Sequence, residues 1–103
     1  MGAYLQGAVL LDTHLQGTNV MGEYLQEASL QDAHLQGTDL RGAHLEKANF
    51  LVAHLEGADL WGAYLQGADL SRARGLTQEQ IEQAYGNENT KLPEGLQLPA
   101  AWG

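Results

Sequence analysis

The histidines are the side chains of this chain whose type and spacing could do chemistry. Three of the four, His14, His34 and His54, recur at intervals of twenty residues. Imidazole rings set about 5 Å apart, the spacing of neighbouring strands, could share a metal ion. Only Glu56 adds a carboxylate beside this row, so we interpret the row as solvated rings and expect neither a metal nor a cofactor. Protonated rings would repel one another, so acid below about pH 6 should loosen their face.

Arrangements typical of catalysis are missing from the sequence. It contains no Ser-His-Asp order, no glycine-rich phosphate loop and no paired buried carboxylates. It also contains no cysteine, which excludes disulfides and thiolate metal ligands. We therefore expect a protein that is not an enzyme.

The elements that must position these side chains follow from a period of five residues. Over most of the chain, a large apolar residue stands at every fifth position, usually with a small residue two positions before it. On an α-helix these residues would spiral around the axis, and on one continuous strand they would alternate between faces. A strand of two or three residues followed by a corner keeps all of them inside, and stacked turns then bury a continuous core. The inward row consists of Leu5, Leu10, Leu15, Val20, Leu25, Leu30, Leu35, Leu40, Leu45, Phe50, Leu55, Leu60, Leu65 and Leu70.

This pattern resembles the pentapeptide-repeat proteins, whose repeat is Ala, Asp or Asn, Leu or Phe, a polar residue and often Gly. Matching segments include Ala48-Asn49-Phe50, Ala58-Asp59-Leu60 and Ala68-Asp69-Leu70, and the resemblance covers residues 3 to about 74. It implies an all-β solenoid, a right-handed quadrilateral β-helix with four repeats, or twenty residues, in each coil. Family members are mostly of unknown function, and a few acidic, rod-shaped dimers mimic DNA and bind gyrase.

The residue before each inward side chain alternates in kind, which supports an even number of repeats per coil. Ring-bearing residues alternate with small polar ones, and Val9 is the exception. With four repeats per coil, these residues form four columns whose members are spaced by about 4.7–4.9 Å. The columns are Tyr4-Tyr24-His44-Tyr64, Val9-Ser29-Asn49-Asp69, His14-His34-His54 and Asn19-Asp39-Asp59.

The repeat ends near residue 74, so we predict a β-helix over residues 1–74 and a cap of the same domain over residues 75–103. A short helix is predicted within residues 76–86. Thr77 is its N-cap, Gln80 completes a capping box, and Gly86 is the left-handed residue that follows it. After a turn at residues 92–95, the extended apolar tail should cover the last coil and prevent edge pairing.

Glu23 breaks the repeat because it stands where other repeats have a small inward residue. A buried carboxylate is costly, so we expect a local bulge that turns it to solvent, and the alternative is a buried group that anchors a ligand. Thr13, Thr18 and Thr38 occupy equivalent positions, where a hydroxyl can bond to a backbone carbonyl.

The residue after each inward side chain is mostly Gln or Glu, and the exceptions suggest a partner surface. Met21, Arg41 and Trp61 fall one coil apart in one column, and they are the candidate partner surface. Leu11 and Leu51 share another column. The alternative is that these are scattered exposed apolar residues, which are common.

Composition limits the kind of partner. A net charge of -8 and a pI of about 4.6 argue against binding to nucleic-acid phosphates or to an anionic membrane surface. No apolar run approaches a membrane span and no signal peptide follows Met1, so a cytoplasmic protein is the default. The first coil lacks a cap, so either a homodimer forms through that end or the chain is a fragment.

Two classes of function remain. The first is a non-enzymatic structural scaffold or protein–protein interaction module with an unknown protein partner. The alternative is an acidic DNA mimic that binds a type II topoisomerase such as gyrase, as the resemblance and the acidic charge suggest. The repeats would make a rod of about 17 Å at the strand spacing. Since that is only half of a duplex turn of roughly 34 Å, size weakens this alternative.

Overall fold

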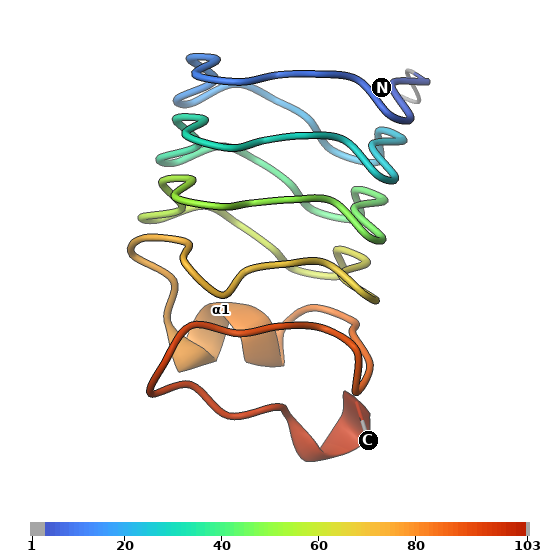
Figure 1. The fold of residues 1–103 in the computed structure, drawn as a ribbon, viewed down its shortest axis with the longest axis vertical. Coiled ribbons are helices and arrows are strands. Elements are labelled where there is room, and N and C mark those ends of the chain that lie inside the picture. Colours follow the sequence, from blue (N-terminus) through green and yellow to red (C-terminus); the bar gives the residue numbers. More distant parts are fainter. Residues whose placement is uncertain (1–3, 103) are drawn as a thin grey trace.

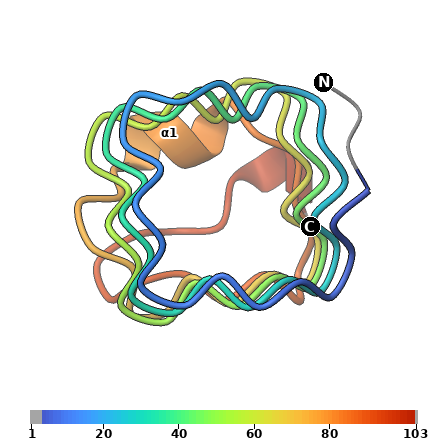
Figure 2. The same ribbon diagram turned by 90° about the horizontal axis from the view of Figure 1, so that it is seen from above.

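Residues 4–102, described by a computed structural model, wind into a stack of four-sided coils with a short helix and an extended tail at one end (Figures 1 and 2). Seen from above, successive coils superpose almost side on side (Figure 2). The predicted role of Met1 at the start of the first repeat lies outside the described residues.

Bridges between coils fix the register of the stack. Each repeat contributes one residue to a parallel bridge with the residue twenty positions further on, as Tyr24 does with His44 and Ser29 with Asn49. One coil is therefore twenty residues, or four repeats, as expected. The inward residue also bonds to the next coil: the N–H of Leu45 donates to the carbonyl of Tyr64 at 2.8 Å. A two-residue corner follows each inward residue, so three residues of each repeat are extended, as expected.

The core is the inward row together with the small residues two positions before it. In the central coils Leu45, Phe50 and Leu55 are fully buried, and so are their small companions such as Ala43 and Ala53. The prediction that every fifth residue points inward is confirmed here. In the first coil the row is less well covered, since Leu10 and Leu15 are only partly buried.

Each corner needs a residue in the left-handed region, two positions after the inward one. Glycine usually fills this position, as Gly57 does with φ of 69°, which explains the frequent fifth-position glycine. Five repeats place other residues there, and the most strained of them is Val52 with φ of 59°, because a β-branched side chain is rarely left-handed.

Replacing Val52 with glycine should therefore stabilise the fold. The left-handed conformation costs a non-glycine residue roughly 1–2 kcal/mol, whereas glycine costs about 0.5–1 kcal/mol of chain entropy. We expect Val52→Gly to raise the free energy of unfolding by about 0.5–1 kcal/mol in urea titrations. The matched control is Gly57→Val, whose Cβ would meet only one atom, the backbone nitrogen of Gly37 at 3.9 Å, and which should lose about 1–2 kcal/mol through backbone strain. A less stable Val52→Gly beside a neutral Gly57→Val would contradict this explanation.

Two expectations about interrupted repeats have opposite outcomes. The prediction of a bulge at Glu23 is wrong. The N–H of Glu23 donates to the carbonyl of Val20 at 3.3 Å, and its carbonyl accepts from the N–H of His44 at 2.8 Å, as in regular repeats. The side chain is half-buried. The hydroxyl contacts are confirmed, because Thr18 and Thr38 both donate to the carbonyl of Leu15 at 2.7 Å.

The cap begins with α1 (Gln78–Glu82), which is shorter than the predicted helix. Its N-cap Thr77 and the capping box with Gln80 are confirmed. The Gln80 amide also donates to the carbonyls of Leu55 and Ala58, both at 2.9 Å, and so fixes α1 to the stack. The role given to Gly86 is wrong, because its φ is not left-handed.

The rest of the cap continues the stack rather than merely covering it. Tyr85 bridges to Tyr64 and Lys91 to Asp69, with one and two extra residues relative to the regular spacing of twenty. Ala84-Tyr85-Gly86 thus repeats the small–outward–inward triplet, but Gly86 lacks the inward side chain. Trp102, from the 3-10 helix η1 (Ala100–Trp102), fills that space: a Cβ on Gly86 would lie 2.5 Å from its indole ring.

Candidate functional site

The histidine row is a stack of parallel rings. The ring centroids of His14 and His34 are 4.4 Å apart, and those of His34 and His54 are 4.8 Å apart, with interplanar angles of 2° and 6°. Parallel rings direct their nitrogens side by side rather than toward one point. Across residues 4–102, no group of three or more His, Cys, Asp or Glu residues could hold a metal ion. The loosening of this face in acid stays a prediction.

A second row of rings runs along the opposite face and reaches the cap. The stack of Tyr4, Tyr24, His44 and Tyr64 has centroid spacings of 4.6–4.9 Å. Tyr85 extends it at 5.2 Å and is 55% exposed. The sequence did not single out Tyr85 because the extra residue before it hides its register.

The predicted column Met21-Arg41-Trp61 divides into parts with different surroundings. Met21 is half-buried. The guanidinium of Arg41 donates to both carboxylate oxygens of Asp39, at 2.9 and 2.8 Å, and lies 3.7 Å from Asp59. Only Trp61 combines a large apolar surface with high exposure, at 65%. Arg41 is therefore engaged by Asp39 and Asp59 on its own face. Trp61 instead lines a cleft together with residues of the cap.

The hydrogen bonds from Arg41 hold the pKa of the Asp39 carboxyl below its ordinary value. Because the folded-state pKa is lowered, this pair contributes stability above the unfolded pKa of about 3.9 and loses it as the pH falls through the lowered folded value. We expect Arg41→Gln to raise the pKa of Asp39 in an NMR titration of the side-chain carboxyls. Asp69 is the internal control, because its lowered pKa depends first on the hydroxyl of Ser71. An unchanged Asp39 in this variant would show that Arg41 is not the cause.

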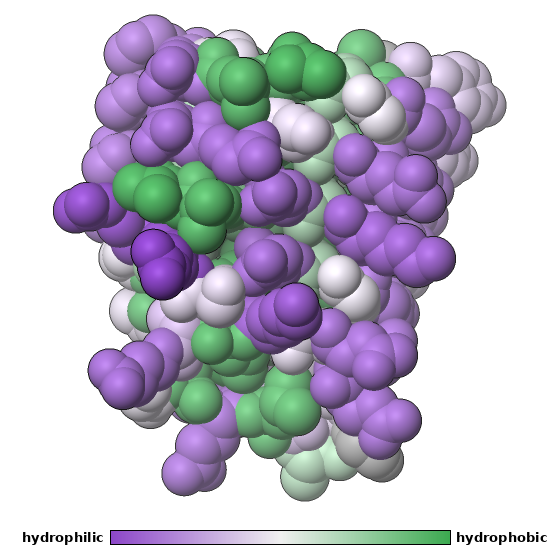
Figure 3. All heavy atoms as spheres, viewed as in Figure 1, coloured by the Kyte–Doolittle hydropathy of each residue, from purple (hydrophilic) through white to green (hydrophobic). Residues whose placement is uncertain are grey.

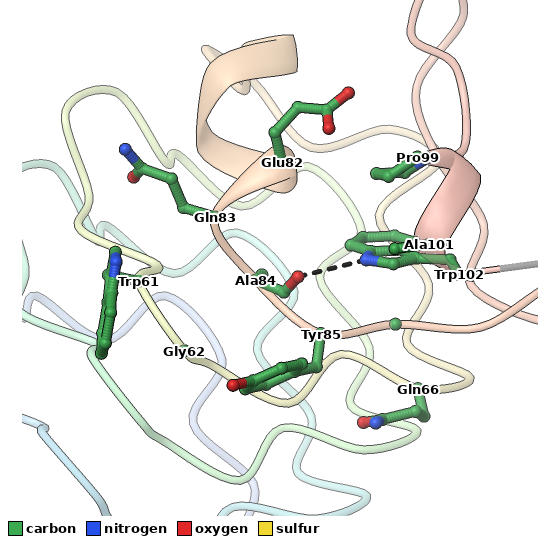
Figure 4. Close-up of a pocket in the computed structure, with 11 residues that line it drawn as sticks. Trp61, Gly62, Gln66, Glu82, Gln83, Ala84, Tyr85, Pro99, Ala101 and Trp102 are labelled. Atoms are coloured by element: carbon green, nitrogen blue, oxygen red, sulfur yellow. Dashed lines mark hydrogen bonds between the residues drawn. The ribbon is translucent and has the colours of Figure 1, made fainter.

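A cleft lies where the stack meets the cap (Figure 4). It has a volume of about 460 Å³. Trp61 comes from the regular coils, Tyr85 from the part of the cap that continues the stack, and Pro99 and Trp102 from the tail. The indole N–H of Trp102 donates to the carbonyl of Ala84 at 3.1 Å, which holds this largely buried ring under the cleft. Exposed rings on a fixed floor provide apolar area with little conformational freedom to lose on binding.

The polar groups of the cleft are few. Gln66, Glu82 and Gln83 line it, and Glu82 is its one charged lining residue among those described. The side-chain amide of Gln78, at the start of α1, donates to the Glu82 carboxylate at 2.9 Å and holds that carboxylate against the helix. No titratable pair, nucleophile or phosphate cradle is found in the cleft as the structure describes it, so its geometry suits binding of an apolar or mixed surface.

Comparison with known families and structures gives the context for this geometry. The model described as pentapeptide repeats in eight copies matches residues 24–53 and 53–74. The chain belongs to the pentapeptide-repeat family. This family is generally non-catalytic. The right-handed quadrilateral β-helix expected from the resemblance is confirmed by solved structures of its members.

Three solved structures show how far the likeness extends. HetL, a pentapeptide-repeat protein involved in heterocyst differentiation regulation in the cyanobacterium Nostoc sp. strain PCC 7120, is 30% identical over 91% of this chain, with a TM-score of 0.75. Rfr23 from the cyanobacterium Cyanothece 51142 is 27% identical over 86% of it, with a TM-score of 0.52. QnrB1, a plasmid-mediated fluoroquinolone resistance protein, shares the fold at 16% identity over 85% of the chain, with a TM-score of 0.55.

This pentapeptide-repeat chain is shorter than those neighbours. It spans 44% of HetL, 63% of Rfr23 and 38% of QnrB1. No curated protein matches its sequence. Within the described part of the chain, none of the helices has the length and apolar character needed to cross a membrane.

Proposed function

We propose that this chain is a non-enzymatic protein-interaction module that binds its partner in the cleft between Trp61 and the C-terminal cap. The observation that supports this most is the pair of exposed rings, Trp61 at 65% and Tyr85 at 55%, above the fixed ring of Trp102. Tryptophan and tyrosine supply most of the binding free energy in many protein interfaces.

The charge of the chain favours a basic segment as the occupant. The net charge is -8, so long-range electrostatics favour a basic partner over an acidic one. Glu82 adds a carboxylate to the cleft lining, and the faces of Trp61 and Tyr85 can accept a guanidinium or ammonium group. An arginine or lysine side chain stacked on these rings would satisfy both features.

A library of random peptides displayed on phage tests this function without assuming any partner sequence. Selection on the wild-type chain should enrich peptides rich in Arg and Lys with aromatic or aliphatic neighbours. For such a peptide, Trp61→Ala should weaken binding at least tenfold in calorimetric titrations. The control Leu11→Ala removes another exposed apolar side chain, far from the cap, and should change affinity less than twofold. Equal effects of the two substitutions, or enrichment of acidic peptides, would contradict the proposal.

Mimicry of DNA toward gyrase is a second candidate, suggested by the acidic charge and by the few acidic members of the pentapeptide-repeat family that mimic DNA. One feature weighs against it, because Arg41 neutralises part of the Asp39-Asp59 column. We expect no inhibition of gyrase supercoiling at high micromolar concentrations, and inhibition there would favour the mimic over the cleft.

A further inference from the structure

Two of the four tyrosines stack across the boundary between the regular coils and the cap. Tyr64 belongs to the regular repeat, and Tyr85 follows α1 in the part of the cap that continues the stack. Their ring centroids are 5.2 Å apart, with an interplanar angle of 24°. The N–H of Tyr85 donates to the carbonyl of Ala63, and its carbonyl accepts from the N–H of Leu65, both at 2.7 Å. The backbone therefore holds the two phenol rings beside each other.

The surroundings of this pair leave it open to oxidation. Tyr85 is 55% exposed, so an oxidant in solution reaches its ring, and Tyr64 beside it is half-buried. On its other side Tyr64 stacks on His44 at 4.6 Å, so Tyr85 is the tyrosine next to it in the row. The chain contains no cysteine, whose thiol is readily oxidised and would compete with the phenols. Loss of an electron from one phenol therefore takes place beside a second phenol.

We infer that Tyr64 and Tyr85 form a site of oxidative cross-linking, at which a one-electron oxidant such as the oxidised haem of a peroxidase joins the two rings as dityrosine. Each phenol loses one electron to the oxidant and its hydroxyl proton to water, which leaves a tyrosyl radical on each ring. The unpaired electrons are shared with the carbons ortho to oxygen, and one such carbon from each ring forms the new C–C bond. The two ortho hydrogens then move as protons to the oxygens, so the net loss is two electrons and two protons.

The geometry favours coupling within one chain over coupling between chains. Two groups held in contact react as in a unimolecular step, which corresponds to a high effective concentration. Tyr85 is exposed, so its ring can turn from a stacked to an edge-to-edge position without displacing the core. The bridge keeps the two residues at the spacing of adjacent strands, about 4.7–4.9 Å, while the ring turns.

A link at this position would join the cap to the regular coils covalently. The cap is otherwise held by hydrogen bonds and by apolar packing, in which Leu76, Leu92 and Leu96 lie partly buried against the core. Figure 3 shows apolar side chains in the cap, below the regular coils, on the face that it displays. The cap covers the last coil and so prevents edge pairing. Cross-linking should therefore keep the last coil covered, and this effect does not depend on the proposed function.

Oxidation of the chain with peroxidase and hydrogen peroxide, followed by trypsin and mass spectrometry, tests the inference. The working chain carries Tyr4→Phe, because Tyr4 and Tyr24 are also stacked, at 4.9 Å. Trypsin cleaves at Arg72 and Arg74, between the two tyrosines of the pair, so a link is detected as two joined peptides that have lost two hydrogens. The monomer band should contain this product. The melting temperature of the linked chain should rise by about 10 °C, because the link restricts the unfolded chain.

Matched substitutions that keep a ring at each position identify the pair. Adding Tyr85→Phe should abolish the product, whereas adding Tyr24→Phe, which removes a tyrosine outside the pair, should leave its yield unchanged. In urea, at equal consumption of tyrosine, the yield should fall roughly tenfold because the rings are no longer held together. Circular dichroism checks that each variant is folded. Absence of the product from the folded working chain, equal yields with and without urea, a product that persists without Tyr85, or a linked chain with an unchanged melting temperature would overturn the inference.

Discussion

Leu45→Ala should lower the free energy of unfolding by about 3–4 kcal/mol, within the range measured for alanine substitutions of buried leucines. The Leu45 side chain is fully buried, and its neighbours in the same column, Leu25 and Leu65, are buried on either side of it. The bridges between coils fix the coil spacing, so the cavity left by the substitution cannot collapse.

The matched control for this substitution is Leu98→Ala, because Leu98 is 42% exposed in the tail. It should change stability by less than about 0.5–1 kcal/mol. Urea titrations followed by circular dichroism measure both variants. Equal losses for the two leucines would mean that the inward row is not the core.

The second large effect is expected at the contact between Gly86 and Trp102. Gly86→Ala adds a Cβ that would lie 2.5 Å from the indole ring, so the ring must leave its place. Trp102 is 8% exposed, and its loss from the core should cost about 3 kcal/mol, as Trp102→Ala should also do. Both variants should also expose the last coil and promote aggregation.

A double-mutant cycle separates this contact from a general intolerance of the cap. In the Trp102→Ala background the space beside Gly86 is empty, so adding Gly86→Ala should cost less than about 1 kcal/mol further. The coupling energy should therefore be about 2 kcal/mol, in the range seen for residues in contact. Additive losses would show that Gly86 and Trp102 act independently and that the ring does not replace the missing inward side chain.

Much of the β-helix could be predicted because its signal is local and repeated. A period of five excludes a simple helix or strand, and the alternation at the bridge position gives columns that the structure contains, such as His14-His34-His54. The capping box at Thr77 was also predictable, since its partners are three residues apart.

The cap and the cleft were harder to predict because they depend on contacts between residues distant in sequence. Gly86 looks like a helix terminator, but its small size serves Trp102, which lies in the tail. Tyr85 and Lys91 continue columns after one and two inserted residues, so the period of five no longer reveals them. Trp61 was identified by its type, but its neighbours across the cleft belong to the cap.

Residue-resolved amide hydrogen exchange tests the central claim most directly, namely that the backbone turns at every fifth residue and bonds to coils twenty residues away. Over residues 26–50, four amides of each repeat donate to a backbone carbonyl, as those of residues 47–50 do, and should exchange slowly. The residue after the inward one is different. At Gln31, Gln36 and Glu46 its amide has no backbone acceptor within residues 4–102, so these three amides should exchange fast. Fast amides at these positions, between slow neighbours, are the predicted result. Continuous protection through residues 26–50, as in an α-helix, or no protection there, would contradict the account.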